Sequence, residues 1–543
     1  DRIEVNGYRA TITSSGWYYY LPLSEGLNNI PHPVAWVSLD KDDNDSGRFW
    51  SYFISALQTV NAGALIENTQ DRSLAKRGWN GTYTQVHLAR SDPHAAPAIL
   101  GHTPFGHAGE RVLDGMMREW GVKPAGDNGS FFQWFDHPYT VVNDIGMLQL
   151  HLPQKDGSVI LKNYKAPEEY YPGMNSGNGI VTAEVVFVGY GVTAPELDYD
   201  DYKDIDVKGK IVLMNRDVPY KDVRNPEYAR WVNYCYHQYK VENAARHGAA
   251  GMLYIDGNSA NPNISYIENM IVCGIGPVPL NDIFAGLGKD NTAIIAQIDK
   301  SFKPASFATG KVMTLKANTT RHPEGKTCNV IGMIEGTDPK LKEEVIIIGG
   351  HLDAVGNAGG LLVAGGYDNA SGVVDIMAAA KALAQSGIKL NRTIVFLFIG
   401  GEEVGLLGSK YYTRNPVFPK ERTVTYINLD MVGNGTGLAV SASATCQGLT
   451  GYFKEANDKY IHRPMRISTS GGSFYGRPRS DGLVFLADGY RTMSISTTDG
   501  VKPVFYHLPG DDETAVTPEI MEDVAKMIYL SFIEMGSADT LSY

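Results

Sequence analysis

The sequence predicts an α/β fold, in which a mixed, largely parallel sheet carries helices on both faces, together with a second unit rich in β-strands. The first observation is a series of short apolar runs, rich in β-branched residues, at residues 344–348, 393–399, 424–429 and 491–496. The second is an Ala-rich helical stretch at residues 372–386, which lies between the first two runs and ends at Gly387. Continuous apolar strands that alternate with helices indicate a sheet buried on both faces.

The second unit is predicted from residues 180–315, where strands and glycine-rich turns follow one another closely. Residues 181–188, 207–214 and 249–255 have strand character, and residues 239–247 have helical spacing that stops at Gly248. This pattern predicts a compact, β-rich module. Upstream of it, residues 109–120 predict a helix, and the glycines and proline of residues 121–126 indicate a turn.

Composition excludes several classes of protein. The chain has 543 residues, of which 43% are hydrophobic, so it is not mainly disordered. The net charge of −12 gives no basic surface for nucleic acid or for an anionic membrane. No apolar run approaches the ~18 residues that a membrane-spanning helix needs. We therefore expect no nucleic-acid partner and no membrane span, while the oligomeric state stays open.

The cysteines and the N-terminal residue bear on the cellular compartment. The four cysteines, Cys235, Cys273, Cys328 and Cys446, form no CxxC pair, which excludes a zinc knuckle, although one or two disulfides remain possible. The sequence begins with Asp1 and lacks a signal segment. We expect a processed, exported protein that is secreted or periplasmic.

Polar residues able to bind a metal follow the predicted strands of the last region one after another. They are His351 and Asp353, Asp368, Glu402 and Glu403, Asp430, and His507. In open α/β sheets, ligands bind outside the carboxyl ends of the strands. Imidazole and carboxylate groups are typical ligands of catalytic zinc, and one carboxylate often joins two metals. Each short motif alone occurs by chance, but their succession at strand ends predicts a metal site.

These motifs make the sequence resemble a known family. His351-x-Asp353, Asp368-Asn-Ala-Ser-Gly372, Gly401-Glu-Glu-Val-Gly405, Asn428-Leu-Asp-Met-Val432 and Tyr506-His507 resemble, in order and spacing, the co-catalytic di-zinc exopeptidases. That family includes bacterial leucyl-type aminopeptidases and glutamate carboxypeptidase-type enzymes. The resemblance implies a zinc-exopeptidase fold of the phosphorylase/hydrolase-like type.

The resemblance also implies a role for each site residue. One zinc ion would be bound by His351 and Asp430, and the other by Glu403 and His507, with Asp368 bridging both. Glu402 would be the general base and acid, Asp353 would orient His351, and Tyr506 would steady the oxyanion. We therefore expect two Zn²⁺ ions per chain.

Further likenesses set the expected domain boundaries. Residues 188–191, 201–202, 207–210 and 247–251 resemble the protease-associated (PA) insert of such enzymes. We expect an accessory region of unknown role at 1–85, the first part of the peptidase domain at 86–175, the PA insert at 176–318 and the catalytic domain at 319–543. Residues 33–58 resemble a piece of a bacterial regulator ATPase, but no phosphate-binding loop supports nucleotide binding.

One loop departs from the family pattern. Where members often have Ser-Asp-His, this chain has Ser480-Asp481-Gly482, preceded by Arg477 and Arg479. These arginines either read an acidic substrate group or belong to a solvated turn.

The function expected from the resemblance is that of a zinc-dependent exopeptidase that acts on peptides, with aminopeptidase action favoured. A carboxypeptidase of the same family, a catalytically decayed binding protein and a mono-zinc enzyme resembling glutaminyl cyclases remain alternatives. The residues leave side-chain specificity open.

Overall fold

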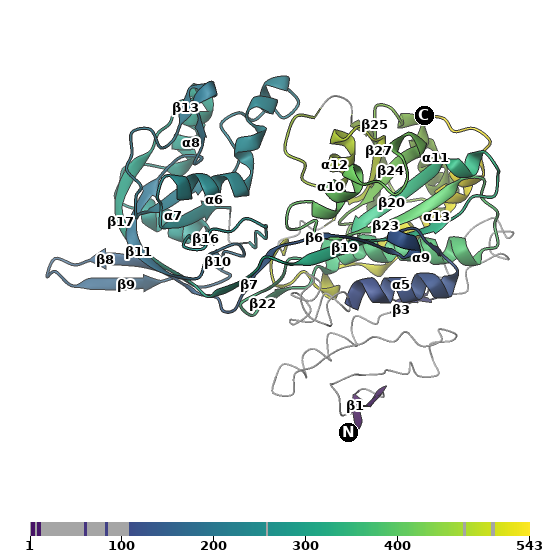
Figure 1. Ribbon diagram of the computed structural model, residues 1–543, viewed down its shortest axis with the longest axis horizontal. Coiled ribbons are helices and arrows are strands. Elements are labelled where there is room, and N and C mark those ends of the chain that lie inside the picture. Colours follow the sequence, from purple (N-terminus) through teal and green to yellow (C-terminus); the bar gives the residue numbers. More distant parts are fainter. Residues whose placement is uncertain are drawn as a thin grey trace.

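The computed structural model has two lobes (Figure 1). It describes residues 108–256, 259–470, 474–500 and 505–543, with four short strands nearer the N-terminus: β1 (Arg2–Val5), β2 (Tyr8–Thr11), β3 (Thr59–Asn61) and β4 (Thr82–Thr84). Apart from these strands, the accessory region predicted at 1–85 lies outside the described residues, and so does the ATPase-like stretch at 33–58.

The first lobe is built on a nine-stranded sheet. Its centre is parallel, in the order β27 (Thr492–Thr498), β24 (Thr423–Leu429), β20 (Val345–His351) and β23 (Thr393–Ile399). Antiparallel pairs flank this centre: β19 (Lys326–Ile334) joins β23 and pairs with β5 (Lys123–Pro124) and β6 (Phe132–Asp136), and β25 (Gly437–Ser443) joins β27. Beyond β25, the edge strand β26 (Met465–Ser470) pairs with it parallel. The predicted mixed sheet is confirmed.

Helices cover both faces of this sheet, as predicted. One face packs against α5 (Ala108–Trp120), α9 (Ser371–Gln385), α11 (Thr450–Ala456) and α13 (Pro518–Ser537). The other face carries α10 (Leu407–Arg414) and α12 (Asp481–Ala487), whose Tyr412 and Phe485 are fully buried. Every residue of β20, β23 and β24 is buried, which explains why these strands are continuous apolar runs without alternation.

The second lobe is an eight-stranded sheet with helices. The strand order is β10 (Tyr170–Pro172), β16 (Ile271–Ile275), β15 (Gly251–Ile255), β14 (Ile211–Asn215), β11 (Gly179–Phe187), β17 (Phe307–Ala317), β8 (Met147–Pro153) and β9 (Val159–Asn163). Around it lie the short pair β12 (Thr193–Ala194) and β13 (Tyr199–Asp200), and the helices α6 (His237–Arg246), α7 (Pro277–Phe284) and α8 (Asn291–Ser301).

Two details of this lobe differ in extent from the sequence expectations. The PA insert was expected to begin at residue 176. This boundary lies between β10 and β11, which are strands of the same sheet. The strand expected at 207–214 begins only at Ile211, because Lys210 N donates to Val207 O across a turn in which Gly209 has a φ of +70°. That positive φ favours glycine and is incompatible with an extended strand.

A narrow ribbon joins the lobes (Figure 1). The chain enters the second lobe after β7 (Tyr139–Val142) and returns along β18 (Thr319–His322), and these two strands pair antiparallel. The pair is extended by β21 (Gly356–Ala358) and β22 (Leu361–Val363) into a four-stranded sheet.

Within the described residues, no helix is long and apolar enough to cross a bilayer. Cys235, Cys273 and Cys446 are buried and carry free thiols.

The packing of α12 on the sheet generates a stability prediction. Phe485 is fully buried and stacks on Tyr426 of β24 with 3.7 Å between ring centroids. Phe485→Ala should therefore destabilise the first lobe by about 3–5 kcal/mol in urea unfolding, because the change leaves a cavity. Ile467→Ala on β26, where the side chain is 41% exposed, is the control and should change stability by less than about 1 kcal/mol. Equal effects would contradict this packing.

Candidate metal centre

The predicted ligands gather where the central strands end. His351 is the last residue of β20, Glu403 follows β23 after a short loop, and Asp430 directly follows β24. Asp368 lies in the turn Gly366–Ala370 that leads into α9, and His507 lies in the segment between β27 and α13. Parallel strands end at the same sheet edge, so distant parts of the sequence meet at one place.

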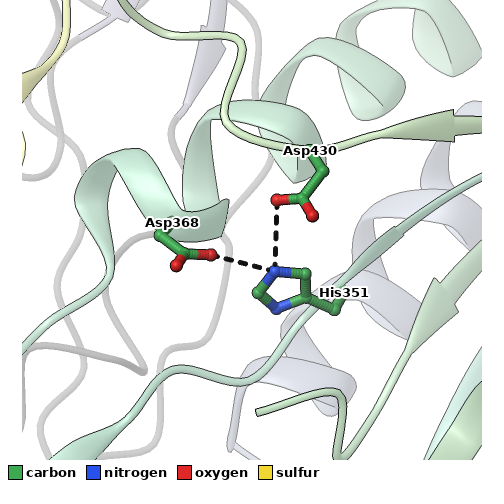
Figure 2. A group of neighbouring side chains, drawn as sticks. All are labelled: His351, Asp368 and Asp430. Carbon is green, nitrogen blue, oxygen red and sulfur yellow. Dashed lines mark ion pairs between the residues drawn. The ribbon is translucent and has the colours of Figure 1, made fainter. Parts of the chain in front are cut away.

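The carboxylate of Asp368 lies between two histidines. His351 Nε2 is 3.0 Å from Asp368 Oδ1 and 3.4 Å from Asp430 Oδ1, as Figure 2 shows. His507 Nε2 is 3.4 Å from Asp368 Oδ2 and 3.0 Å from Glu403 Oε2. Two groups of three potential ligand atoms result, each within 4.8 Å, and they share Asp368.

The charges in this cluster depend strongly on one another. Burial lowers the pKa of His351, but Asp368 and Asp430 outweigh burial, so that the pKa lies well above its ordinary value. Burial raises the pKa of Asp368, yet hydrogen bonds from His351 and His507 bring it below its ordinary value. The buried carboxylates therefore need positive charge beside them.

The donor set fits zinc. Each group offers one imidazole nitrogen and two carboxylate oxygens, and three protein ligands with an open fourth position are the usual arrangement of catalytic zinc. Glu403 Oε1 is buried and accepts no hydrogen bond from the described residues, although buried carboxylate oxygens normally have partners.

Neighbouring side chains fix the backbone around Asp368. The carboxylate of Asp511 accepts hydrogen bonds from Tyr367 N at 2.6 Å and from Asp368 N at 3.1 Å. The side chain of Asn369 donates to Leu429 O at the end of β24, at 2.9 Å. The central carboxylate is therefore held by two other segments of the chain.

Asp353 holds the loop that carries the two glutamates. Its carboxylate accepts hydrogen bonds from Glu402 N at 3.0 Å and Glu403 N at 3.1 Å. His351 Nδ1 lies 3.1 Å from the backbone oxygen of Asp353 and 3.8 Å from its carboxylate. The family resemblance implied that this carboxylate orients His351, and of these two contacts the one to the carbonyl is the shorter. Burial raises the pKa of Glu402, which lies in this loop, well above its ordinary value.

The second lobe contacts the metal centre through Ala260. Its carbonyl oxygen lies 3.1 Å from His507 Nδ1, and its N–H donates to His507 O at 3.0 Å. Tyr506 stacks on His507 with ring centroids 3.9 Å apart and is 44% exposed. Its hydroxyl makes no hydrogen bond to any residue that the structure describes.

The loop that departs from the family pattern separates its two arginines. Arg479 is exposed and forms an ion pair with Asp217 of the second lobe, at 2.9 Å. Arg477 lies over the ring of Tyr236. Asp481, which begins α12, is fully buried, and burial raises its pKa to about 7 against the charge of His351.

Sequence reasoning missed three residues of this site. Asp481 was noted only because Ser480-Asp481-Gly482 departs from the Ser-Asp-His motif of the family, and it was given no role. Asp511 and Ala260 carried no signal, because a carboxylate that binds backbone and a carbonyl that accepts from a ligand have no characteristic sequence pattern.

Two family models match the chain: Peptidase family M28 over residues 329–531 and the PA domain over residues 181–276. Leupeptin-inactivating enzyme 1 of Streptomyces exfoliatus is 34% identical over 128 residues, covering 23% of this chain and 27% of that protein. Leucine aminopeptidase 2 of Arthroderma otae is 30% identical over 200 residues, covering 34% of this chain and 38% of its own. The matches thus span less than half of these relatives.

Solved structures share the fold over most of the chain. An aminopeptidase from Aneurinibacillus sp. strain AM-1 has a TM-score of 0.57 at 19% identity, over 89% of this chain and 97% of that one. A peptidase M28 precursor from Shewanella amazonensis SB2B has a TM-score of 0.52 at 17% identity, over 89% and 98%. The chain thus has the fold of these structures, with residues 329–531 matching peptidase family M28 and residues 181–276 matching the PA domain.

Proposed function

We propose that the protein is a zinc-dependent aminopeptidase that removes residues from the N-terminus of peptides. The observation that carries this proposal is the shared carboxylate of Asp368, with one histidine facing each of its oxygens. One carboxylate between two N/O ligand groups is what a site for two metals requires. The names of the relatives, among them a leucine aminopeptidase, support the same reaction class.

The residues would divide the work as follows. His351 and Asp430 would hold one zinc, Glu403 and His507 the other, with Asp368 between them. When bound, zinc supplies Lewis acidity toward the scissile carbonyl and lowers the pKa of water.

Glu402 would perform the proton transfers. Its carboxylate would take a proton from the attacking water and return that proton to the leaving amine. The bond from Glu402 N to Asp353 positions the backbone for this task. The hydroxyl of Tyr506 would donate a hydrogen bond to the oxyanion.

The direction of attack follows from charge. Two zinc ions would neutralise the three acidic ligands, but Glu402 and Asp481 add two further carboxyl groups beside the centre, and such groups suit a free α-ammonium better than a carboxylate.

We also propose that the protein acts outside the cytosol. Among its relatives is a vacuolar membrane protease of Lodderomyces elongisporus, 29% identical over 192 residues.

The first prediction from the proposed function concerns metal content. Elemental analysis after gentle dialysis should find two zinc ions per chain, because Asp368 serves both ligand groups. Treatment with a chelator should abolish peptidase activity, and added zinc should restore it. Full activity with one reproducible zinc ion per chain would overturn the di-zinc assignment and favour the mono-zinc alternative.

The second prediction separates the two neighbouring glutamates. Glu402→Gln keeps the shape of the side chain but accepts no proton, so kcat should fall at least ~100-fold while zinc content persists. The matched variant Glu403→Gln should lose zinc first, because it removes an acidic ligand. Retained kcat in zinc-loaded Glu402→Gln would place the base elsewhere.

The third prediction tests the direction of attack. Acetylating the N-terminus of a good substrate of six or more residues should abolish cleavage, because it removes the ammonium. Amidating its C-terminus should leave kcat/KM nearly unchanged. The reverse pattern, measured on the same peptide by chromatography of the products, would identify a carboxypeptidase.

A further inference from the structure

Two cations meet at the junction of the lobes. Lys410 belongs to α10, and Arg477 to the loop before α12. Both lie over the ring of Tyr236 from the second lobe: Lys410 Nζ is 5.8 Å and Arg477 Cζ 5.9 Å from its centroid. Both side chains are half-buried. Two like charges are thus held beside one aromatic ring.

Among the residues that the structure describes, neither cation forms an ion pair with a carboxylate, although Arg477 acts electrostatically on Asp256 and Lys410 is influenced by Glu402 and Asp481. Arg477 Nε is buried and makes no hydrogen bond, and Lys410 Nζ donates only to the backbone oxygen of Gly405, at 2.8 Å. Burial, with the charges of Arg414 and Arg477, lowers the pKa of Lys410. Holding these charges together is unfavourable, and an anion placed between them would relieve the repulsion.

Lys410, one of the two cations, lies near the loop that carries the proposed general base. Lys410 Nζ contacts Gly405 O, and Gly405 N donates to Glu402 O at 3.0 Å. The negative charges of Glu402 and Asp481 partly offset the fall in the pKa of Lys410. Lys410 is therefore close to the catalytic loop, which leads directly into its helix α10.

The second lobe adds the N-terminus of a helix on the same side. Helix α6 begins at His237, directly after Tyr236, whose side chain makes no capping hydrogen bond. Gln238 Nε2 lies 3.7 Å from the position of a Cβ built on Gly405, so this helix end faces the catalytic loop. The positive end of a helix dipole favours an anion there.

Glu402 indicates which part of a substrate lies near the cations. If Glu402 protonates the leaving amine, as proposed above, the leaving residue must lie on its side of the cleft. The non-ligand carboxyl groups beside the metal centre and the cationic junction then match the ammonium and the carboxylate of a short zwitterionic peptide.

We propose that Arg477 and Lys410 form a subsite for a carboxylate carried by the residue after the scissile bond. This carboxylate is either the free C-terminus of a dipeptide or an acidic side chain at the second position. The guanidinium of Arg477 would bind the two carboxylate oxygens, and Lys410 would add a single charge. The inference rests on the proposed aminopeptidase function and names the substrates that this site prefers.

The test compares four substrates with one cleavable Leu each: Leu-Ala, Leu-Ala amide, Leu-Asp amide and Leu p-nitroanilide. Arg477→Gln in the zinc-loaded full chain should lower kcat/KM for Leu-Ala or Leu-Asp amide at least about tenfold, mainly through KM. Leu-Ala amide and Leu p-nitroanilide, which lack the carboxylate, should change less than about twofold. Lys410→Gln should give a smaller loss on the same substrates.

Arg479→Gln is the matched control, because it removes a cation from the same loop whose charge is already paired with Asp217. It should leave all four values unchanged. Arg477→Lys should recover part of the loss, and thermal melting of every variant separates misfolding from a loss of binding.

Each result is decisive. A loss on Leu-Ala alone supports the subsite and identifies the C-terminus as its ligand, and a loss on Leu-Asp amide identifies the side chain. Equal losses on all substrates, or none on any, overturn the subsite and leave Arg477 as a clamp between the lobes. Failure of the zinc-loaded wild-type protein to cleave any member of a panel of aminoacyl p-nitroanilides overturns the aminopeptidase function itself.

Discussion

The structure of the site depends on one buried carboxylate that faces two histidines. An apolar residue could not replace Asp368, because His351 and His507 approach its two oxygens from different segments of the chain. Removing the carboxylate would leave two buried imidazoles and two further acids without a common partner. Such a group is costly to bury alone and stable only when its charge is matched. The turn before α9 therefore serves the site as much as the helix.

Two acids next to this carboxylate, Asp511 and Asp353, bind backbone N–H groups. Asp511 binds two N–H groups next to the central carboxylate, and Asp353 binds the N–H groups of both glutamates. Each of these acids thus fixes a loop that has no regular secondary structure to hold it. The loops that carry the candidate ligands at the strand ends are fixed in this way, because acidic side chains accept the hydrogen bonds that a strand or helix would otherwise accept from these N–H groups.

The sequence predicted the core strands and the ligand candidates because both follow local rules. A short apolar run rich in β-branched and aromatic residues, such as residues 393–399, favours a strand covered on both faces, and this prediction agrees with β23 residue by residue. The flanking strands β8, β9 and β10 were not assigned to the second sheet, because their pairing with β17 and β16 depends on distant partners. Ala260 was out of reach for a related reason, since any residue type can supply a carbonyl oxygen.

The paired contacts of Ala260 and His507 make the two lobes thermodynamically linked. The backbone of Ala260 in the second lobe donates to His507 O and accepts from its imidazole. The same two hydrogen bonds therefore stabilise both the orientation of the ring and the docking of the lobe. Linkage is reciprocal: whatever fixes the ring must tighten the docking by the same amount, and whatever pulls the lobes apart must loosen the ring. A domain that contributes no side chain to the ligand set thereby acquires a thermodynamic influence on that set.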